Sequence, residues 1–442
     1  MQLKWLGAVC CLAIAIPGAA QKAPDHDQVP LSYIHNAYPH TERVDAAGGG
    51  STLGTRSYGS LLGVDTVTNW SSYFYLPGAV PSEGDFPQFT WPYSMVGNSP
   101  FAKGEDGQGR TTIHAPIIPV IIDLRNADGS PRFLNGHRLI LSPTPLIENL
   151  LKSPVFSNSS YDSSQAPTQF TDAVQRAEFY HEASQGWHTV LKPQVMTTRT
   201  MVLLKGTYMF AVDSNGNLAY VLVDFGVFLS ELFPPTADDT TTVIGAAEHA
   251  GDLRTQDIGT FYFNNTYLYS STPTGIDCCI LGFHSYDLEP GDAGNGWRER
   301  RYVMNYSSWI SPGLFGAAFG DITAVSHEMA ETFNDPFTNN ATPIWVAPNG
   351  NCQNTLETGD VIEGLPNATY PISLNGYVYH PQNEALLQWF AAQSPSSAID
   401  HAYSYPDTTV LTSPSVSYFS DCATPFTYSK GVKSAGLAIL AH

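Results

Sequence analysis

The sequence predicts an α+β fold, in which a mixed or antiparallel sheet gathers around a few helices. Three observations lead to this prediction. Many short β-prone runs are separated by Gly, Pro and Asn turn signals. Residues 117–124 form an apolar run with the length of a buried strand. Residues 321–336 instead repeat their apolar side chains with helical spacing.

The first twenty residues have the pattern of a signal peptide. Lys4 precedes an apolar run at residues 6–16, and small residues follow at 17–20, where we expect cleavage near Ala20. The run is too short to span a bilayer. We therefore expect residues 1–20 to be removed and the chain to be secreted to the extracellular space. A retained anchor is the alternative.

The charge balance restricts the partners. Acidic residues outnumber basic ones by 40 to 20, which gives a net charge of −20. An acidic surface repels the phosphates of nucleic acids and of anionic lipids. We therefore expect neither nucleic acid nor membrane as a partner.

Four cysteines remain after the signal peptide: Cys278, Cys279, Cys352 and Cys422. An even number in an exported chain predicts disulfide bonds. Neighbouring cysteines rarely bond to each other, because the small ring strains the peptide between them. We therefore expect Cys278 and Cys279 each to reach a distant partner. No CxxC spacing occurs, which argues against a thiolate zinc site.

The elements are expected in the following order. Residues 21–110 read as a leader or linker with a small β region, whose strands are expected at 70–76 and 89–96. Residues 111–442 form the α+β domain. Its elements are a strand at 117–124, helices at 146–151 and 168–180, strands at 201–204, 208–212, 218–228, 260–269 and 279–284, the helix within 321–336, a helix at 383–393, and short strands in the tail. Asn215-Gly216-Asn217 predicts a hairpin turn.

The segment 321–336 contains the candidate catalytic and metal-binding residues. Asp321 is the expected N-cap, and Pro336 ends the helix. One face is an apolar stripe made of Ile322, Val325, Met329 and Phe333. His327 and Glu331 lie one turn apart on the opposite face, which is the geometry of a zinc helix with a carboxylate in place of the second imidazole.

This spacing predicts roles for three side chains. His327 and Glu331 would bind Zn²⁺ at about 2.0–2.2 Å. Glu328 would act as the general base on a water molecule. Because carboxylates neutralise the charge of the ion and weaken it as a Lewis acid, Ca²⁺ and Mn²⁺ are alternative ions. The competing interpretation is a helix with a solvent-exposed acidic face and one ordinary histidine.

A third ligand is expected after the helix. Glu357 is the favoured candidate, and Asp360 would accept the other N–H of His327, or the two would exchange roles. His284 and His380 are reserve ligands.

Three short segments resemble a known family. Residues 281–285, 326–336 and 357–360 are similar to the "GYHS", "SHELAE…TDP" and "E-x-x-D" segments of secreted bacterial HExxE proteins, which are described as zinc metallopeptidase-like. Those proteins are in turn distantly similar to the plant phosphate-induced, EXORDIUM-like proteins. We expect a zincin-like fold for the domain. By match to the motifs of this family, the resemblance implies that the site residues are His327, Glu328, Glu331, Glu357 and Asp360.

The sequence thus predicts a secreted zinc-dependent hydrolase, a metallopeptidase acting on protein or peptide substrates. The alternative is a non-catalytic extracellular protein, associated with a cell wall or glycan, that keeps a structural metal. A metal-dependent hydrolase of non-peptide bonds is a third possibility.

Overall fold

The structure is a computed structural model that describes residues 27–35, 37, 40–43, 63–75, 90–101, 109–272, 275–316 and 319–415. The predicted signal peptide, residues 1–20, and Cys422 lie outside these residues. Among the described residues, no helix has both the length and the apolar composition needed to cross a membrane.

The helices of this part of the chain are α1 (Ile147–Lys152), α2 (Phe170–Glu178), α3 (Phe225–Leu232), α4 (Val243–His249), α5 (Thr323–Asn334) and α6 (Leu387–Phe390). Short 3-10 turns are η1 (Leu31–Ile34), η2 (Thr144–Leu146), η3 (Ala293–Asn295) and η4 (Ile399–His401). The strands are β1 (His40–Arg43), β2 (Val64–Asp65), β3 (Asn69–Tyr75), β4 (Thr90–Val96), β5 (Arg110–Arg125), β6 (Phe133–Leu134), β7 (His137–Arg138), β8 (Ile140–Leu141), β9 (His188–Val195), β10 (Arg199–Leu204), β11 (Tyr208–Val212), β12 (Leu218–Asp224), β13 (Ile258–Asn264), β14 (Thr266–Thr272), β15 (Gly275–Glu289), β16 (Glu299–Trp309), β17 (Ala341–Val346), β18 (Cys352–Thr355), β19 (Ile372–Leu374), β20 (Tyr377–Tyr379), β21 (Glu384–Ala385) and β22 (Ser404–Tyr405).

A 12-stranded mixed sheet forms the centre of the fold, with the order β10-β5-β13-β16-β15-β14-β12-β11 and with β1, β2, β8 and β9 paired beside this path. Strands β5, β13 and β16 run parallel, whereas β15 is antiparallel to both β14 and β16. The chain is therefore a mixed α/β protein built on a large mixed sheet with few helices, as the sequence predicted at this level.

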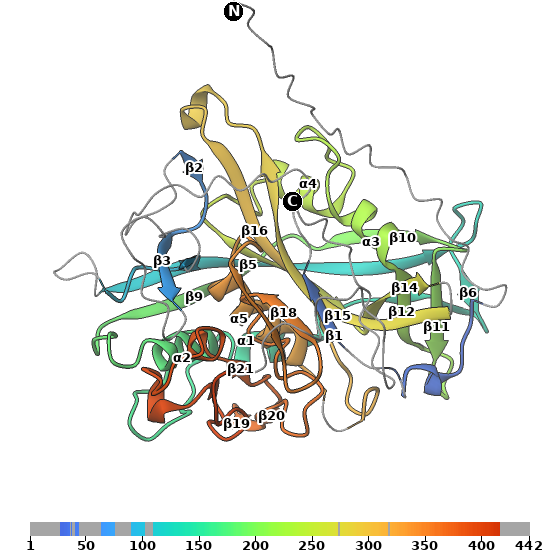
Figure 1. Ribbon diagram of the computed structural model, residues 1–442. Coiled ribbons are helices and arrows are strands. Elements are labelled where there is room, and N and C mark those ends of the chain that lie inside the picture. The colour runs from blue at the N-terminus through green and yellow to red at the C-terminus, as the bar shows by residue number, and fades with distance from the viewer. Residues whose placement is uncertain are drawn as a thin grey trace, which may run out of the picture.

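The long strand β5 separates two packed layers. Val120 and Ile122 pack with α3 and α4, whereas Ala115 and Ile117 pack in the cluster that contains the apolar stripe of α5. Side chains of a strand alternate between its two faces, so one apolar run supplies both layers. Figure 1 shows α3 and α4 on one side of β5, and α1, α2 and α5 on the other.

The N-terminal β region is present and joins the main domain. Strands β3 and β4 pair antiparallel, at the two runs that the sequence predicted. Strand β1 pairs with β15 and β2 with β16, so the segment before residue 66 also contributes to the large sheet.

Three of the predicted elements end or divide at places that the structure explains. The predicted strand 218–228 ends at Asp224, whose side chain accepts the N–H of Val227 and thereby caps α3. The predicted strand 260–269 is two strands, because Asn265 adopts a left-handed φ of 42° between β13 and β14. The predicted helix 383–393 shortens to α6, because its first residues form β21 and pair with β22.

The expected disulfide pattern is wrong. Cys278 and Cys279 bond to each other, and the peptide between them is cis, which brings their Cα atoms to 3.0 Å. Cys352 is also disulfide-bonded. The two bonded cysteines lie in β15, the strand that also contains His284. Cys278 precedes His284 by six residues.

The buried amide of Asn340 fastens the N-terminal β region to the end of α5. Its Oδ1 accepts the N–H of Ser94 at 2.9 Å, and its Nδ2 donates to the carbonyls of Ser94 and Asn334 at 2.7 and 2.6 Å. One side chain thus satisfies backbone groups of β4 and of the last turn of α5.

Asn340→Ala should lower the free energy of unfolding by about 2–4 kcal/mol, because three hydrogen bonds are lost and buried backbone groups are left without partners. Urea denaturation followed by circular dichroism measures the change. Asn215→Ala, in the exposed β11–β12 turn, is the matched control and should change stability by less than about 0.5 kcal/mol. Equal effects of the two substitutions would contradict the anchoring role of Asn340.

Candidate metal centre

Helix α5 is buried over its whole length, from Thr323 to Asn334. Its predicted apolar stripe packs against the sheet, and the polar face is covered as well. The structure therefore excludes the interpretation of α5 as a helix with a solvent-exposed acidic face: Glu328 is 0% exposed and Glu331 is 2% exposed.

The start of α5 differs by one residue from the prediction. Ile322 occupies the N-cap position, and Asp321 stands just before it. The Asp321 carboxylate accepts the N–H of Ile322 at 2.7 Å and contacts His380 Nδ1 at 2.7 Å. His380, a reserve ligand in the sequence analysis, is thus held at the N-terminal end of α5 and belongs to no group of metal-ligating atoms found in the described part of the chain.

A first group of possible ligands contains His327, Glu331 and Asp360. His327 Nε2 lies 3.0 Å from Glu331 Oε2 and 3.5 Å from Asp360 Oδ1. Asp360 therefore faces the same ring nitrogen as Glu331 and not the other N–H of His327, where the sequence analysis had expected it. This arrangement makes Asp360 the third member of the group around His327.

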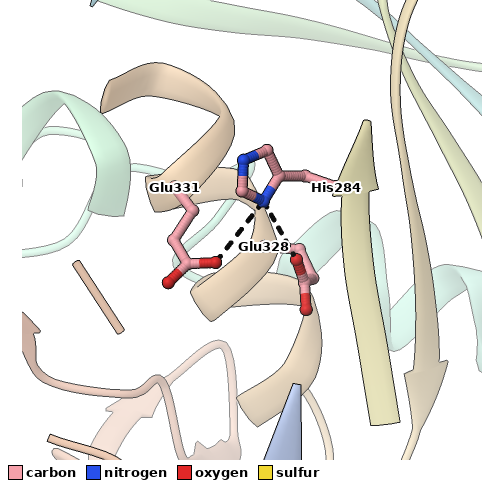
Figure 2. Close-up of side chains that lie close together, drawn as sticks. All are labelled: His284, Glu328 and Glu331. Carbon is pink, nitrogen blue, oxygen red and sulfur yellow. Dashed lines mark ion pairs between the residues drawn. The ribbon is translucent and has the colours of Figure 1, made fainter. Parts of the chain in front are cut away.

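A second group contains His284, Glu328 and Glu331 (Figure 2). His284 Nδ1 lies 3.6 Å from Glu328 Oε2 and 3.4 Å from Glu331 Oε2. The imidazole comes from β15, and both carboxylates come from α5. The strand and the helix thus present three ligand-type side chains to one another across the interface.

Glu357, the favoured third ligand of the sequence analysis, lies on the far side of His284. Its Oε2 is 3.7 Å from His284 Nε2, and it belongs to neither of the two groups. It therefore faces the ring nitrogen opposite to the one that faces α5.

The separations between these atoms match the coordination shell of a metal ion. Ligand atoms at about 2.0–2.2 Å from a tetrahedral ion are about 3.3–3.6 Å from each other. The observed nitrogen–oxygen distances run from 3.0 to 3.7 Å, and most exceed the length of an N–H···O hydrogen bond.

Several buried polar atoms of this site have no hydrogen-bond partner in the described part of the protein. Neither ring nitrogen of His284 and neither carboxylate oxygen of Glu328 has a hydrogen-bond partner. Isolated buried charges are strongly unfavourable unless an opposite charge compensates them. A divalent cation would compensate them.

Two glycines allow this close packing. A Cβ at Gly282 of β15 would overlap the carboxyl group of Glu328, and a Cβ at Gly359 would overlap the ring of His327. The loop around Gly359 also positions Glu331, because the backbone N–H groups of Gly359 and Asp360 donate to its Oε1 at 3.0 and 3.3 Å. Glu331 Oε2 is thereby directed toward both imidazoles.

The charges of the groups are strongly linked. Burial alone would lower the pKa of each imidazole, but Glu357 beside His284 and Glu331 beside His327 help to raise both pKa values well above 6.5. Burial raises the pKa of Glu328 to about 7, although both imidazoles oppose this rise. At Glu331 burial also favours the neutral acid, but His327 and His284 outweigh it and lower the pKa. Without a metal ion, protons on the two imidazoles supply the positive charge of the site. A bound metal ion would replace these protons as the source of positive charge.

Sequence reasoning gave His284 too small a role and missed Glu384. Phe283 packs into the α3–α4 layer, so alternation along β15 turns His284 toward α5, and this signal was present in the sequence. Glu384 is 0% exposed and accepts a hydrogen bond from Thr358 Oγ1 at 3.0 Å. Glu384 is brought to Thr358 by the pairing of β21 with β22, and no local sequence pattern predicts this pairing.

Comparison with known proteins adds no relative: no family model, no curated protein and no solved structure matches the chain. The site therefore has to be interpreted from its own geometry.

Gly359→Ala should weaken Zn²⁺ binding by about 10–100-fold, because the added methyl group must displace the His327 ring from its position. Calorimetric titration of chelator-stripped protein with Zn²⁺ measures the change. Gly109→Ala is the control, since no atom lies within 4 Å of a Cβ at that position. Unchanged affinity in the Gly359 variant would show that the His327 ring takes no part in binding.

Proposed function

We propose that this chain is a secreted zinc-dependent hydrolase with a zincin-like arrangement of helix and sheet, and that it cleaves peptide bonds in protein or peptide substrates. The observation that carries the proposal is the first group of ligands. His327 and Glu331 lie one helical turn apart, Asp360 completes the group, and Glu328 lies beside it without a hydrogen-bond partner.

The residues have distinct roles in this proposal. His327, Glu331 and Asp360 would hold the ion, which supplies Lewis-acid polarisation of the scissile carbonyl and lowers the pKa of water. Glu328 accepts the proton from the attacking water and returns it to the leaving amine. A carboxyl group whose pKa is about 7 is suited to both transfers near neutral pH. Gly282 leaves the space that Glu328 occupies.

In this proposal substrate reaches the ion from the side of Asp360, the most exposed of the three ligands. Its side chain is 21% exposed, whereas those of His327 and Glu331 are 0% and 2% exposed. The side of the first group that is open to solvent is therefore the Asp360 side, in the loop that follows β18. Secretion rests on the signal-peptide pattern of residues 1–20.

The donor set bears on the identity of the ion. One imidazole and two carboxylates give Zn²⁺ a neutral complex, whereas oxygen-rich donor sets also suit Mn²⁺ and Ca²⁺. An imidazole in each group favours a transition metal over Ca²⁺.

A second candidate function is supported by the burial of the site. Structural zinc sites are closed, whereas catalytic ones keep a position open for water or substrate. The almost complete burial of His327 and Glu331 would also suit a non-catalytic extracellular protein, associated with a cell wall or glycan, in which the metal stabilises the interface between α5 and the loop.

Glu328→Gln distinguishes the two functions. In a hydrolase this variant should keep one Zn²⁺ per chain but lose turnover by about 10²–10⁴-fold, because the amide cannot accept a proton. The measurements are elemental analysis of the purified protein and cleavage of an unstructured protein substrate. Chelator should abolish cleavage by the wild type, and added Zn²⁺ should restore it.

Glu182→Gln is the matched control, since His181-Glu182 begins like the metal motif but lies in the turn that follows α2. This variant should retain full turnover. A wild-type protein that binds zinc tightly, unfolds more readily after chelation and cleaves no peptide bond would support the structural alternative and refute the hydrolase.

A further inference from the structure

The two imidazoles of the centre belong to different groups of ligands. Glu331 is common to both groups, whereas His284 and Glu328 occur only in one and His327 and Asp360 only in the other. Among the described residues, no group of three ligand atoms within 4.8 Å of one another contains both imidazoles.

A single ion cannot be bound by both groups in this arrangement. Two ligands of one ion at about 2.0–2.2 Å are at most about 4.4 Å apart, even when they lie on opposite sides of it. Because the imidazoles are further apart than one ion can span, a single ion at His327 leaves His284 unused.

We propose that the centre has a second divalent-ion position formed by His284, Glu328 and Glu331, and that Glu331 Oε2 is shared between the two ions. The class of ligand is a transition-metal cation such as Zn²⁺ or Mn²⁺, since the position offers one imidazole and two carboxylates. The proposal rests on the proposed function for the identity of the first position.

The side chains of the second position are buried and have the free ligand atoms that an ion needs. His284 is 1% exposed and Glu328 is 0% exposed, and neither has a hydrogen-bond partner within the protein. Glu357 Oε2 lies 3.7 Å from Nε2 of His284, on the side of the ring that faces away from α5, and Nδ1 is directed toward Glu328 and Glu331. Figure 2 shows this nitrogen between the two carboxylates.

The shared carboxylate is held in a bridging orientation. Backbone N–H groups of Gly359 and Asp360 occupy Glu331 Oε1, so only Oε2 is directed toward the ions. Oε2 lies 3.0 Å from His327 Nε2 and 3.4 Å from His284 Nδ1. Glu328, Glu331, Glu357 and Asp360 carry four negative charges when ionised, which two divalent ions neutralise.

Occupation of the second position has a consequence for catalysis. An ion bound to the Glu328 carboxylate lowers its affinity for a proton, so Glu328 becomes a weaker base toward water. The second ion therefore inhibits hydrolysis, and the enzyme is most active when one ion is bound.

Metal stoichiometry tests the proposal directly. Chelator-stripped wild-type protein is titrated with Zn²⁺ and with Mn²⁺, and bound metal is measured after dialysis. We expect two ions per chain. Two Mn²⁺ ions that share an oxygen, on the order of 3.5–4 Å apart, couple magnetically, so the paramagnetic resonance spectrum should lose the form typical of isolated Mn²⁺ as the second ion binds.

Variants separate the two positions. His284→Ala should bind one ion and should not be inhibited by excess Zn²⁺, whereas His327→Ala should lose the first ion. Glu331→Gln should weaken both ions by about tenfold or more, because the bridge is lost. His181→Ala, which replaces an exposed histidine in the turn after α2, should still bind two ions.

The outcomes distinguish this proposal from the proposed function. A wild-type protein that binds no ion refutes both. One tightly bound ion with chelator-sensitive hydrolysis, and no second ion at excess Zn²⁺ or Mn²⁺, refutes the second position alone. Two ions with the spectrum of isolated Mn²⁺ refute the shared carboxylate, and hydrolysis that rises with the second equivalent refutes the inhibitory role.

Discussion

The burial of acidic side chains between α5 and β15 is the constraint on which the rest of this structure depends. Glu328 and Glu331 leave water completely when the helix packs on the sheet, and each would be costly there as an isolated charge. The fold compensates this cost by bringing His284 from the sheet into contact with both carboxylates and His327 from the helix into contact with Glu331. Positive charge is therefore needed where α5, β15 and the loop after β18 meet, because it offsets the cost of burying these carboxylates.

The backbone around this junction is adapted to the same requirement. Gly282 lets the strand approach Glu328, and Gly359 lets the loop approach the His327 ring. The N–H groups of that loop fix one oxygen of Glu331. At the two ends of α5, polar side chains tie the helix to its surroundings: Asp321 holds His380 at the start, and Asn340 holds β4 at the end. The position of the helix is thus fixed at both ends and in the middle.

The arrangement also explains why the roles of the acidic residues were hard to assign. The site contains six carboxyl and imidazole groups, which belong to His284, His327, Glu328, Glu331, Glu357 and Asp360. Each could be a ligand, a base or a partner of a ligand, and these roles depend on which ring nitrogen each carboxylate faces. Asp360 faces the nitrogen of His327 that also faces Glu331, whereas Glu357 faces the nitrogen of His284 that points away from α5. The difference between a ligand and an orienting partner is therefore a matter of side-chain direction.

Local features of the protein could be predicted from its amino-acid order. Apolar periodicity predicted the buried strand β5 and the helix α5, and the i, i+4 spacing placed His327 and Glu331 on one face because a helix turns every 3.6 residues. Turn chemistry predicted the β11–β12 hairpin, and aromatic runs predicted β3 and β4. The tertiary structure alone decided the order of the sheet, the bond between Cys278 and Cys279, the burial of the acidic face of α5 and the approach of His284 and Glu384. Except for the bond between the neighbours Cys278 and Cys279, these features join residues far apart in the chain, and their energies come from burial and charge compensation that appear only when the layers pack.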